Sequence, residues 1–422
     1  MYKIFLCFLC FFCAYGYAVD QEIGSQKKIL VLSSKGGYGH AAAVNSLERL
    51  LGDGYVLQVV HPIDHMLRSS GVSSGEQWYN LMLAKGWIRS MNFLARRMAP
   101  YFFCSNEEKL EKIIHACIEE HHPELVISVI PFINYPASEA ARKADLPYLV
   151  ITTDNDLRNW SYGLEKIKHP LFQITIGADL PTTRDVLLRK NIPESCIQTI
   201  GLPLRPDFID YSTEADLRKE YQISPEKPVI LVMMGGAGST SGYDYARKIG
   251  ALDLSTHLII CTGRYEKLKK DLEKIELHPS NSMTIIGFTD KIADLMAMAD
   301  LIITKPGPGT INEAIAMQLP VIVDNTEVSL FWERANTDMI TRYGIGQGIK
   351  NLKTLEATLE GYLSEGAVRE GIRKSFAALP PNLFHEKIKE VIDGLLVPRE
   401  PGLIAMEDSY IPTDSSESTT LD

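Results

Sequence analysis

A turn rich in glycine and proline at residues 304–314 combines residue types that suit an anionic ligand. The sequence Gly-Pro-Gly-Thr at residues 307–310 separates an apolar run from a helical stretch. It therefore opens a helix whose unpaired N–H groups and positive dipole end favour a diphosphate. Glu313 lies one turn into this helix, where its carboxylate suits the two hydroxyls of a ribose. A capping box between Thr310 and Glu313 is the alternative, and both interpretations stay open.

A second glycine-rich turn, at residues 35–40, reads Lys-Gly-Gly-Tyr-Gly-His. Its glycines, Gly36, Gly37 and Gly39, allow a sharp turn and a close approach of the backbone to a ligand. An imidazole is a natural general base near neutral pH, so His40 is a candidate base at the start of a predicted helix. A histidine that only caps this helix is the alternative.

The third turn, at residues 234–240, contains Gly235, Gly236 and Ser239 after an apolar strand. Bare backbone amides in such a turn suit a phosphate or a sugar hydroxyl. No Gly-Lys-Ser/Thr follows, so the turn is not a Walker loop. It also lacks the G-x-G-x-x-G pattern, which removes the main support for a dinucleotide-dependent oxidoreductase.

The tripeptide Asp154-Asn155-Asp156 has the Asp-x-Asp spacing with which some transferases hold a divalent metal. It lies in the first half of the chain, away from the turns that suit a phosphate. A loop with local aspartate turns is therefore favoured over a metal site.

Apolar strands alternate with helical stretches through most of the chain, a pattern typical of parallel sheets covered by helices. The predicted class is α/β with two doubly wound domains, at residues 26–206 and 207–395, and a proline-containing linker at 201–208. The glycine-rich turns follow strands at their carboxyl ends, where such sheets bind ligands. The predicted strands are residues 27–34, 55–60, 125–130, 148–153, 228–234, 257–261, 283–287, 301–304 and 320–323.

Residues 81–103 are basic and aromatic, with no acidic residue before Glu107. Rings that enter a lipid interface and cations that meet anionic headgroups are what a membrane-surface helix needs. A basic, partly buried core helix is the alternative. The predicted membrane contacts are Lys85, Trp87, Arg89, Phe93, Arg96 and Arg97.

The composition excludes some classes of function. A net charge of -10 argues against an electrostatic nucleic-acid binder. Residues 1–19 resemble a signal peptide or signal anchor, and the Ser-, Thr- and Asp-containing residues 398–422 are predicted to be a disordered tail. The cysteines outside the leader are isolated, so neither a disulfide framework nor a zinc site is predicted.

Six motifs in order resemble a family of GT-B glycosyltransferases. This family includes monogalactosyldiacylglycerol synthase, the processive diacylglycerol glucosyltransferases and the N-acetylglucosaminyltransferase that acts on lipid I. Residues 304–323 are the most specific of these motifs, and the diacylglycerol branch fits better. The motifs are residues 36–43, 123–131, 201–208, 234–239, 287–300 and 304–323.

The resemblance implies roles for individual residues. It implies that Phe288 holds a uracil, Glu313 the ribose, and Gly309 with Thr310 the diphosphate. It makes His40 the candidate base, with Asp154 as its partner or rival. Glu333 and Asn336 match positions that read the sugar hydroxyls, and Arg264 matches a basic position near the nucleotide.

The implied activity is an inverting transfer of a hexose from a UDP-sugar to a lipid, diacylglycerol above all, at a membrane surface without a cofactor. The chain lacks the family's Pro-Gly-Gln between residues 323 and 331, so the sugar (glucose, galactose or N-acetylglucosamine) stays open. UDP-sugars imply the cytoplasmic face, with which the leader conflicts. A UDP-sugar epimerase or hydrolase and a non-catalytic sugar-nucleotide or lipid-binding protein are the alternatives.

Overall fold

The computed structural model describes residues 26–34, 38–69, 82, 86–209, 211–212, 216–236, 239–364 and 366–397. The predicted leader and tail lie outside the described residues, as do Gly36, Gly37 and Lys85. None of the helices in the described ranges has the length and apolar character needed to span a bilayer.

The first domain is built on a parallel sheet that, in the described part of the chain, has six strands in the order β2-β1-β3-β4-β5-β6. Its central strands are buried on both faces, which explains why they read as continuous apolar runs. The order reverses between β1 and β3, so a crevice is expected at their carboxyl ends. The strands are β1 (Lys27–Leu32), β2 (Tyr55–Val60), β3 (Leu125–Ser128), β4 (Tyr148–Ile151), β5 (Phe172–Ile176) and β6 (Ile197–Thr199).

The second domain has a parallel sheet with the order β12-β11-β10-β7-β8-β9 among the described residues. Read from β9, this is the strand order of dinucleotide-binding domains, with its reversal between β7 and β10. The strands are β7 (Val229–Met233), β8 (His257–Cys261), β9 (Ser282–Ile286), β10 (Leu301–Thr304), β11 (Val321–Asp324) and β12 (Gly346–Ile349).

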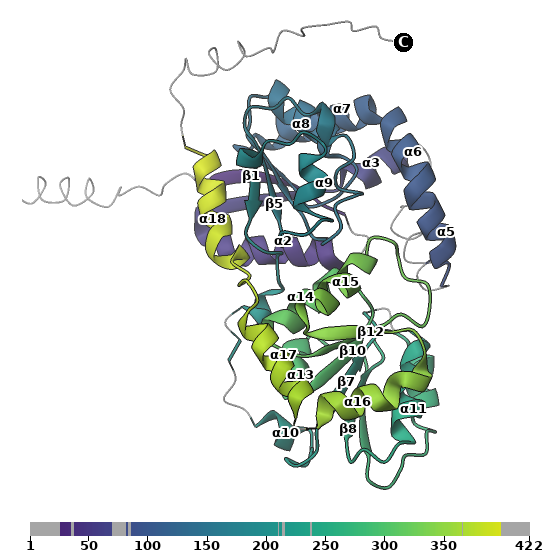
Figure 1. Cartoon of the computed structure of the whole chain (residues 1–422). Coiled ribbons are helices and arrows are strands. Elements are labelled where there is room, and N and C mark those ends of the chain that lie inside the picture. Colours follow the sequence, from purple (N-terminus) through teal and green to yellow (C-terminus); the bar gives the residue numbers. More distant parts are fainter. Residues whose placement is uncertain are drawn as a thin grey trace, which may run out of the picture.

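Helices cover both sheets, and the two domains are stacked with α2 and α14 in contact where they meet (Figure 1). The first domain contains α2 (Tyr38–Leu51), α3 (Pro62–Ser69), α5 (Ile88–Phe93), α6 (Ala99–Ser105), α7 (Glu107–His121), α8 (Asn134–Lys143) and α9 (Arg184–Leu188). The second part of the chain contributes α10 (Leu217–Glu220), α11 (Ser241–Gly250), α12 (Glu266–Leu272), α13 (Ile292–Met298), α14 (Pro308–Ala316), α15 (Arg334–Tyr343), α16 (Leu355–Leu363), α17 (Ala367–Ala377) and α18 (Phe384–Leu395).

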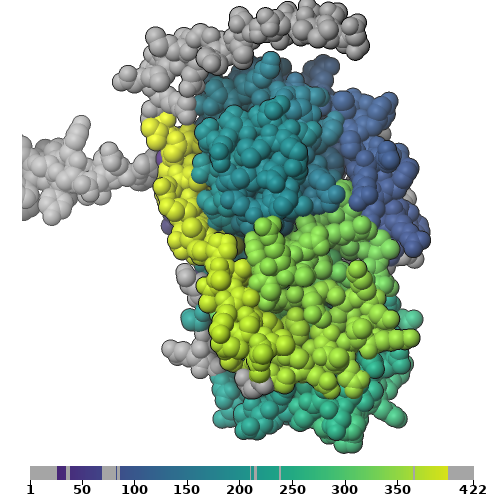
Figure 2. Space-filling view, viewed as in Figure 1, coloured from purple at the N-terminus to yellow at the C-terminus, as the bar shows by residue number. Residues whose placement is uncertain are grey.

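Helix α18 differs from the predicted domain division. The prediction counted it with residues 207–395, but Phe384, Ile388 and Ile392 are buried in the core of the first domain. Asp393 accepts hydrogen bonds from Lys389 at 2.6 Å and from Tyr55 of β2. Figure 2 shows this last helix lying along the first domain. The chain therefore returns to the first domain after completing the second.

All nine predicted strands are present, with ends that differ by at most two residues. Strands β5, β6 and β12 were not predicted. The predicted amphipathic segment forms helices α5 and α6, joined by a π-helical turn at Leu94–Met98.

Candidate functional site

His40 lies in the first turn of α2, at the strand reversal of the first sheet. Its Nδ1 is 2.7 Å from the carbonyl oxygen of Val129, which follows β3. Because a carbonyl only accepts, Nδ1 carries the proton and Nε2 keeps its lone pair. Burial lowers the pKa of His40 to about 4, partly opposed by this hydrogen bond. The imidazole is therefore neutral at physiological pH, with Nε2 as the basic atom.

Asp154 follows β4 and lies near His40. The buried Trp160 donates its indole N–H to Asp154 at 2.7 Å, and its ring centroid is 6.4 Å from that of His40. Burial raises the pKa of Asp154 to about 6, against the hydrogen bond from Trp160. Asp156 instead accepts from Arg158 at 2.8 Å. The two carboxylates of the Asp-x-Asp tripeptide thus have different partners.

The loop after β3 also holds Phe132 at a φ of 71°, which is unusual for a large residue and is typical of functional loops. Its ring stacks on Phe103 of α6 at 5.1 Å, with an interplanar angle of 9°. This stack joins the loop beside His40 to the amphipathic segment.

In the second domain, the loop after β7 comes together with two other predicted donor residues. Gly235 has a φ of 84°, which a glycine adopts without strain. The backbone N–H of Arg264 donates to the carbonyl of Gly236 at 3.2 Å. The Arg264 guanidinium lies 4.5 Å from the ring centroid of Phe288, whose side chain is 53% exposed. Ser239 accepts from the hydroxyl of Ser241 at 3.1 Å.

The helix predicted to bind a diphosphate, α14, begins across the strand reversal from that loop. Gly307 is its N-cap and no side chain caps it. The capping-box interpretation is therefore wrong, because the helix starts before Thr310. Gly309 is exposed and Thr310 is half-buried in the first turn. The first N–H groups of α14 thus have no side-chain acceptor in the described structure.

Glu313 is buried and forms a paired hydrogen bond with Arg205, at 2.5 and 2.7 Å. Burial raises the pKa of Glu313, and the hydrogen bonds from Arg205 oppose that shift. Arg205 belongs to the interdomain linker and was not predicted to be a site residue. The motif at residues 201–208 contained it, but the sequence gives no sign that it pairs with a residue more than a hundred positions away.

Glu333 is the second carboxylate of this region. Its Oε1 lies 4.0 Å from the position that a Cβ would occupy on Gly307, at the start of α14. Burial is the main reason that its pKa is raised to about 7; Lys305 lowers it and the Asp154 carboxylate raises it. Glu333 and Asp154 therefore interact across the boundary between the domains.

Asn336 is buried and joins the two domains. Its Oδ1 accepts from Asn155 at 2.9 Å, and its Nδ2 donates to the carbonyl of Pro306 at 2.8 Å. The side chain thus already has two protein partners. Its contact with the donor sugar stays a prediction.

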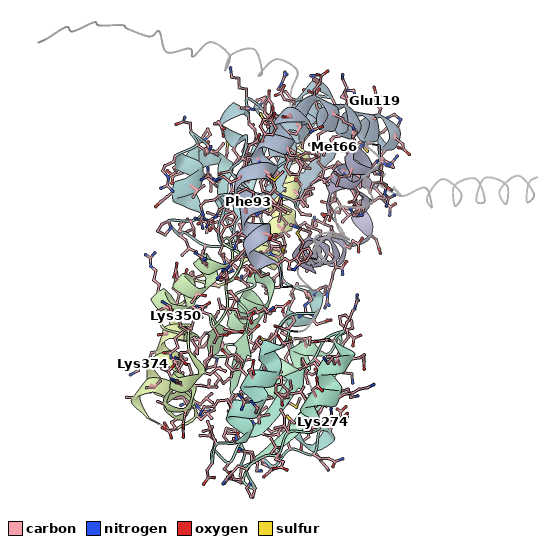
Figure 3. All side chains as sticks on the ribbon, turned by 90° about the vertical axis from the view of Figure 1, so that its right-hand side faces the viewer. Met66, Phe93, Glu119, Lys274, Lys350 and Lys374 are labelled. Atoms are coloured by element: carbon pink, nitrogen blue, oxygen red, sulfur yellow. The ribbon has the colours of Figure 1, made fainter. Side chains whose placement is uncertain are left out.

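The described residues that are predicted to contact a membrane are all exposed. Trp87 and Phe93 are 51% and 61% exposed, and Arg89, Arg96 and Arg97 are exposed as well. Figure 3 looks at this side of the molecule and labels Phe93. The Arg96 guanidinium also lies 4.3 Å from the ring centroid of Phe331 in the second domain.

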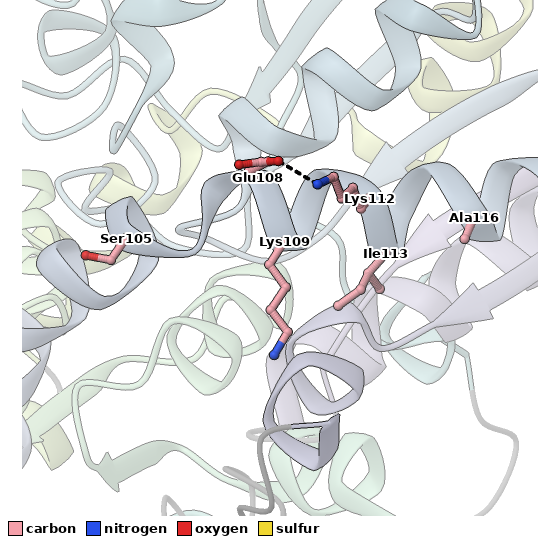
Figure 4. Close-up of a pocket in the computed structure, with 6 residues that line it drawn as sticks. All are labelled: Ser105, Glu108, Lys109, Lys112, Ile113 and Ala116. Atoms are coloured by element: carbon pink, nitrogen blue, oxygen red, sulfur yellow. Dashed lines mark hydrogen bonds and ion pairs between the residues drawn. The ribbon is translucent and has the colours of Figure 1, made fainter.

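A pocket of about 500 Å³ lies along α7, and none of the predicted site residues lines it (Figure 4). In it Lys112 pairs with Glu108 at 2.5 Å. The site residues instead gather where the carboxyl ends of the two sheets meet.

Residues 229–324, from β7 to β11, match the glycosyltransferase family 28 C-terminal domain. The chain is 24% identical over 359 residues to the processive diacylglycerol beta-glucosyltransferase of Bacillus subtilis, covering 80% of this chain and 90% of that one. It is 27% identical over 379 residues to the chloroplastic monogalactosyldiacylglycerol synthase of Spinacia oleracea, covering 83% and 68%.

Several solved structures share the fold, among them a MurG and a UDP-GlcNAc 2-epimerase. The MurG structure of Acinetobacter baumannii has a TM-score of 0.60 at 13% identity and covers 87% of this chain and 99% of that one. The UDP-GlcNAc 2-epimerase of Neisseria meningitidis has a TM-score of 0.55 at 14% identity, with 87% and 100% covered.

The chain has the two-domain GT-B fold, and the comparisons support a glycosyltransferase. Within that class, the chain is similar to the processive diacylglycerol glucosyltransferases and the monogalactosyldiacylglycerol synthases, as the six motifs indicated.

The pairing of Arg205 with Glu313 predicts a large loss of stability when only the arginine is removed. Arg205→Ala leaves a buried carboxylate without its partner and is expected to lower the free energy of unfolding by about 3 kcal/mol. The double variant Arg205→Ala/Glu313→Gln is expected to lose clearly less, because no charge is then stranded. Urea denaturation measures both, with the exposed Arg247→Ala in the same domain as control. Equal losses in the single and double variants would contradict the pairing.

The raised pKa of Glu333 predicts a pH-dependent effect. Since the folded pKa of about 7 exceeds the ordinary 4.5, this carboxyl reduces stability increasingly as the pH rises from the lower value through the higher. Glu333→Gln, which stays neutral, is expected to melt at a higher temperature than the wild type at about pH 8, and at the same temperature near pH 4.5. Thermal melts measure this, with the exposed Glu327→Gln as control. A gain of equal size at both pH values would sink the idea.

Proposed function

We propose that this protein transfers a hexose from a UDP-sugar to a lipid acceptor, diacylglycerol being the first candidate, with inversion at the anomeric carbon. One observation carries the proposal. A neutral His40 with its Nε2 lone pair unused by Val129 lies in the crevice of one domain, and an uncapped helix start lies in the crevice of the other. A base on one side and an anion site on the other are what a displacement of UDP by a hydroxyl requires.

The donor is proposed to lie over the second domain. A uracil stacks on the exposed Phe288, and the ribose hydroxyls use acceptor positions of Glu313 that Arg205 leaves open. The diphosphate lies at the N-terminus of α14, with Lys305 nearby. Helix N–H groups stabilise the charge that develops on the departing UDP. This scheme uses no metal or cofactor.

The acceptor hydroxyl is proposed to lose its proton to Nε2 of His40 as it attacks C1. A pKa of about 4 makes His40 a weak base before substrates bind. The negative charge of a bound UDP-sugar favours the imidazolium and raises that pKa. Asp154 is the rival base, because its pKa of about 6 is closer to neutrality.

The lipid character of the acceptor rests on the amphipathic segment. Its exposed rings and cations suit an anionic membrane surface, and the stack of Phe103 on Phe132 leads from it toward the loop beside His40. The names of the two relatives agree with a diacylglycerol acceptor. We therefore propose that the protein acts at the cytoplasmic face of a membrane, where UDP-sugars are found.

The first experiment measures UDP release by the protein lacking residues 1–19, with UDP-glucose, UDP-galactose or UDP-N-acetylglucosamine, with and without diacylglycerol vesicles. Release that needs vesicles and one donor is expected. His40→Ala is expected to lower the rate by about 10²- to 10⁴-fold without changing UDP affinity, because it removes only the base. His385→Ala, on α18, is the control.

Other outcomes have definite meanings. Release without lipid favours the epimerase or hydrolase alternative, whose fold is the same. UDP binding without turnover of any donor favours a non-catalytic binding protein.

Membrane contact by the amphipathic segment makes a separate prediction. Phe93→Ser/Tyr101→Ser removes two rings that are 61% and 77% exposed. Because each buried ring contributes about 1–3 kcal/mol, binding to anionic vesicles is expected to fall about tenfold or more. Cosedimentation measures it, with Val368→Ser on α17 as a control of similar chemistry. A loss no greater than that of the control would remove this surface from the proposal.

A further inference from the structure

The loop that carries Glu333 is held by the first domain. The Asn92 side chain of α5 donates from Nδ2 to the carbonyl of Ser329 at 3.0 Å. Its Oδ1 accepts from the backbone N–H of Phe331 at 2.9 Å. One amide thus binds two backbone groups of the loop after β11, and fixes both its position and its direction.

Phe331 is anchored in the same place. The residue is 4% exposed, and its ring centroid lies 4.3 Å from the guanidinium of Arg96 and 5.4 Å from that of Arg158. Arg158 also donates to the Phe331 carbonyl at 3.3 Å. Three residues of the first domain therefore hold the loop just two positions before Glu333.

Two of these three residues, Asn92 and Arg96, belong to the amphipathic segment. The third, Arg158, belongs to the loop that contains Asp154. Asn92 stands next to Phe93, which is exposed, and Arg96 lies in the π-helical turn at Leu94–Met98. Such turns are rare and are frequently found at functional sites. Here the turn follows α5, which carries the exposed Phe93, and contains Arg96, which contacts the Phe331 ring.

We propose that Asn92 is a positioning residue for the donor sugar: by fixing the backbone from Ser329 to Phe331 it fixes Glu333, and so makes the membrane-facing helix part of the donor site. This inference rests on the proposed function and on the role that the family resemblance implies for Glu333, which is contact with the sugar hydroxyls. In the proposed function, uracil is bound by Phe288 and ribose by Glu313 of α14, and neither residue belongs to this loop. Asn92 therefore affects recognition of the hexose and leaves recognition of UDP alone unchanged.

A purely structural role, in which Asn92 only holds the two domains together, predicts a different result. Loss of such a contact lowers the melting temperature, and changes the affinities for UDP and for UDP-hexose in the same proportion. The ratio of the two affinities separates a positioning role from a structural one.

The test compares Asn92→Ala with Ser90→Ala, an exposed control on the same helix. Calorimetry measures the affinity for UDP and for the UDP-hexose that the wild type uses, and kinetics measure kcat/KM for UDP-glucose and UDP-galactose. In Asn92→Ala, the affinity for UDP is expected to stay within about twofold and that for UDP-hexose to fall about tenfold, as the loss of two hydrogen bonds implies. The ratio of kcat/KM for UDP-glucose to that for UDP-galactose is expected to move closer to one in Asn92→Ala. Binding of this variant to vesicles is expected to stay unchanged.

Asn92→Asp guards against misfolding. It keeps the acceptor for the Phe331 N–H but faces the Ser329 carbonyl with a second acceptor, so an intermediate loss of UDP-hexose affinity is expected. Equal losses for UDP and UDP-hexose, or no loss for either, would overturn the positioning role while leaving the proposed function intact. A wild type that binds UDP but no UDP-hexose would instead overturn the proposed function.

Discussion

Parallel strands place every following loop at one edge of a sheet, and in this protein the two edges face one another. In the first sheet the reversal of strand order separates the start of α2, which contains His40, from the loop that begins at Val129. The hydrogen bond between these two residues spans that reversal. In the second sheet the reversal separates the Gly235 loop from the start of α14. Both crevices thus follow from topology, and the contacts at Asn336 hold them together.

Burial shifts the pKa values of three groups between the two sheets toward their neutral forms. Burial lowers the pKa of His40 to about 4 and raises those of Asp154 and Glu333 to about 6 and 7. All three shifts disfavour the charged form, as expected where water is largely excluded. These shifts reduce the negative charge of the two carboxyl groups near neutral pH, and so reduce their repulsion of an anionic ligand. Strongly shifted groups that gather in a cleft are typical of catalysis, and they cost stability that a purely structural core would keep.

The sequence predicted features that depend on neighbouring residues, and it missed contacts between residues far apart in the chain. Buried strands such as β1 and β7 have clear apolar runs, and the turns that follow them have clear glycine patterns. Strand β12 contains two glycines and gives no such signal. Helix α18 has an apolar face, but nothing local states which domain covers it. Arg205 and Asn92 were missed for the same reason, since the partner of each lies more than a hundred residues away.

The contacts that hold the loop carrying Glu333 bear on how a glycosyltransferase limits hydrolysis of its sugar donor by water. An activated sugar beside a base is open to attack by water unless the site assembles only when the acceptor is present. Glu333 belongs to the second domain, but its loop is fixed through Asn92 and Phe331 by the first. The two domains therefore share one contact region beside the site. Helix α5, which carries the exposed Phe93, forms the outer edge of that region. In the proposed function, Asn92 thus links the helix with the exposed rings to the loop that carries Glu333.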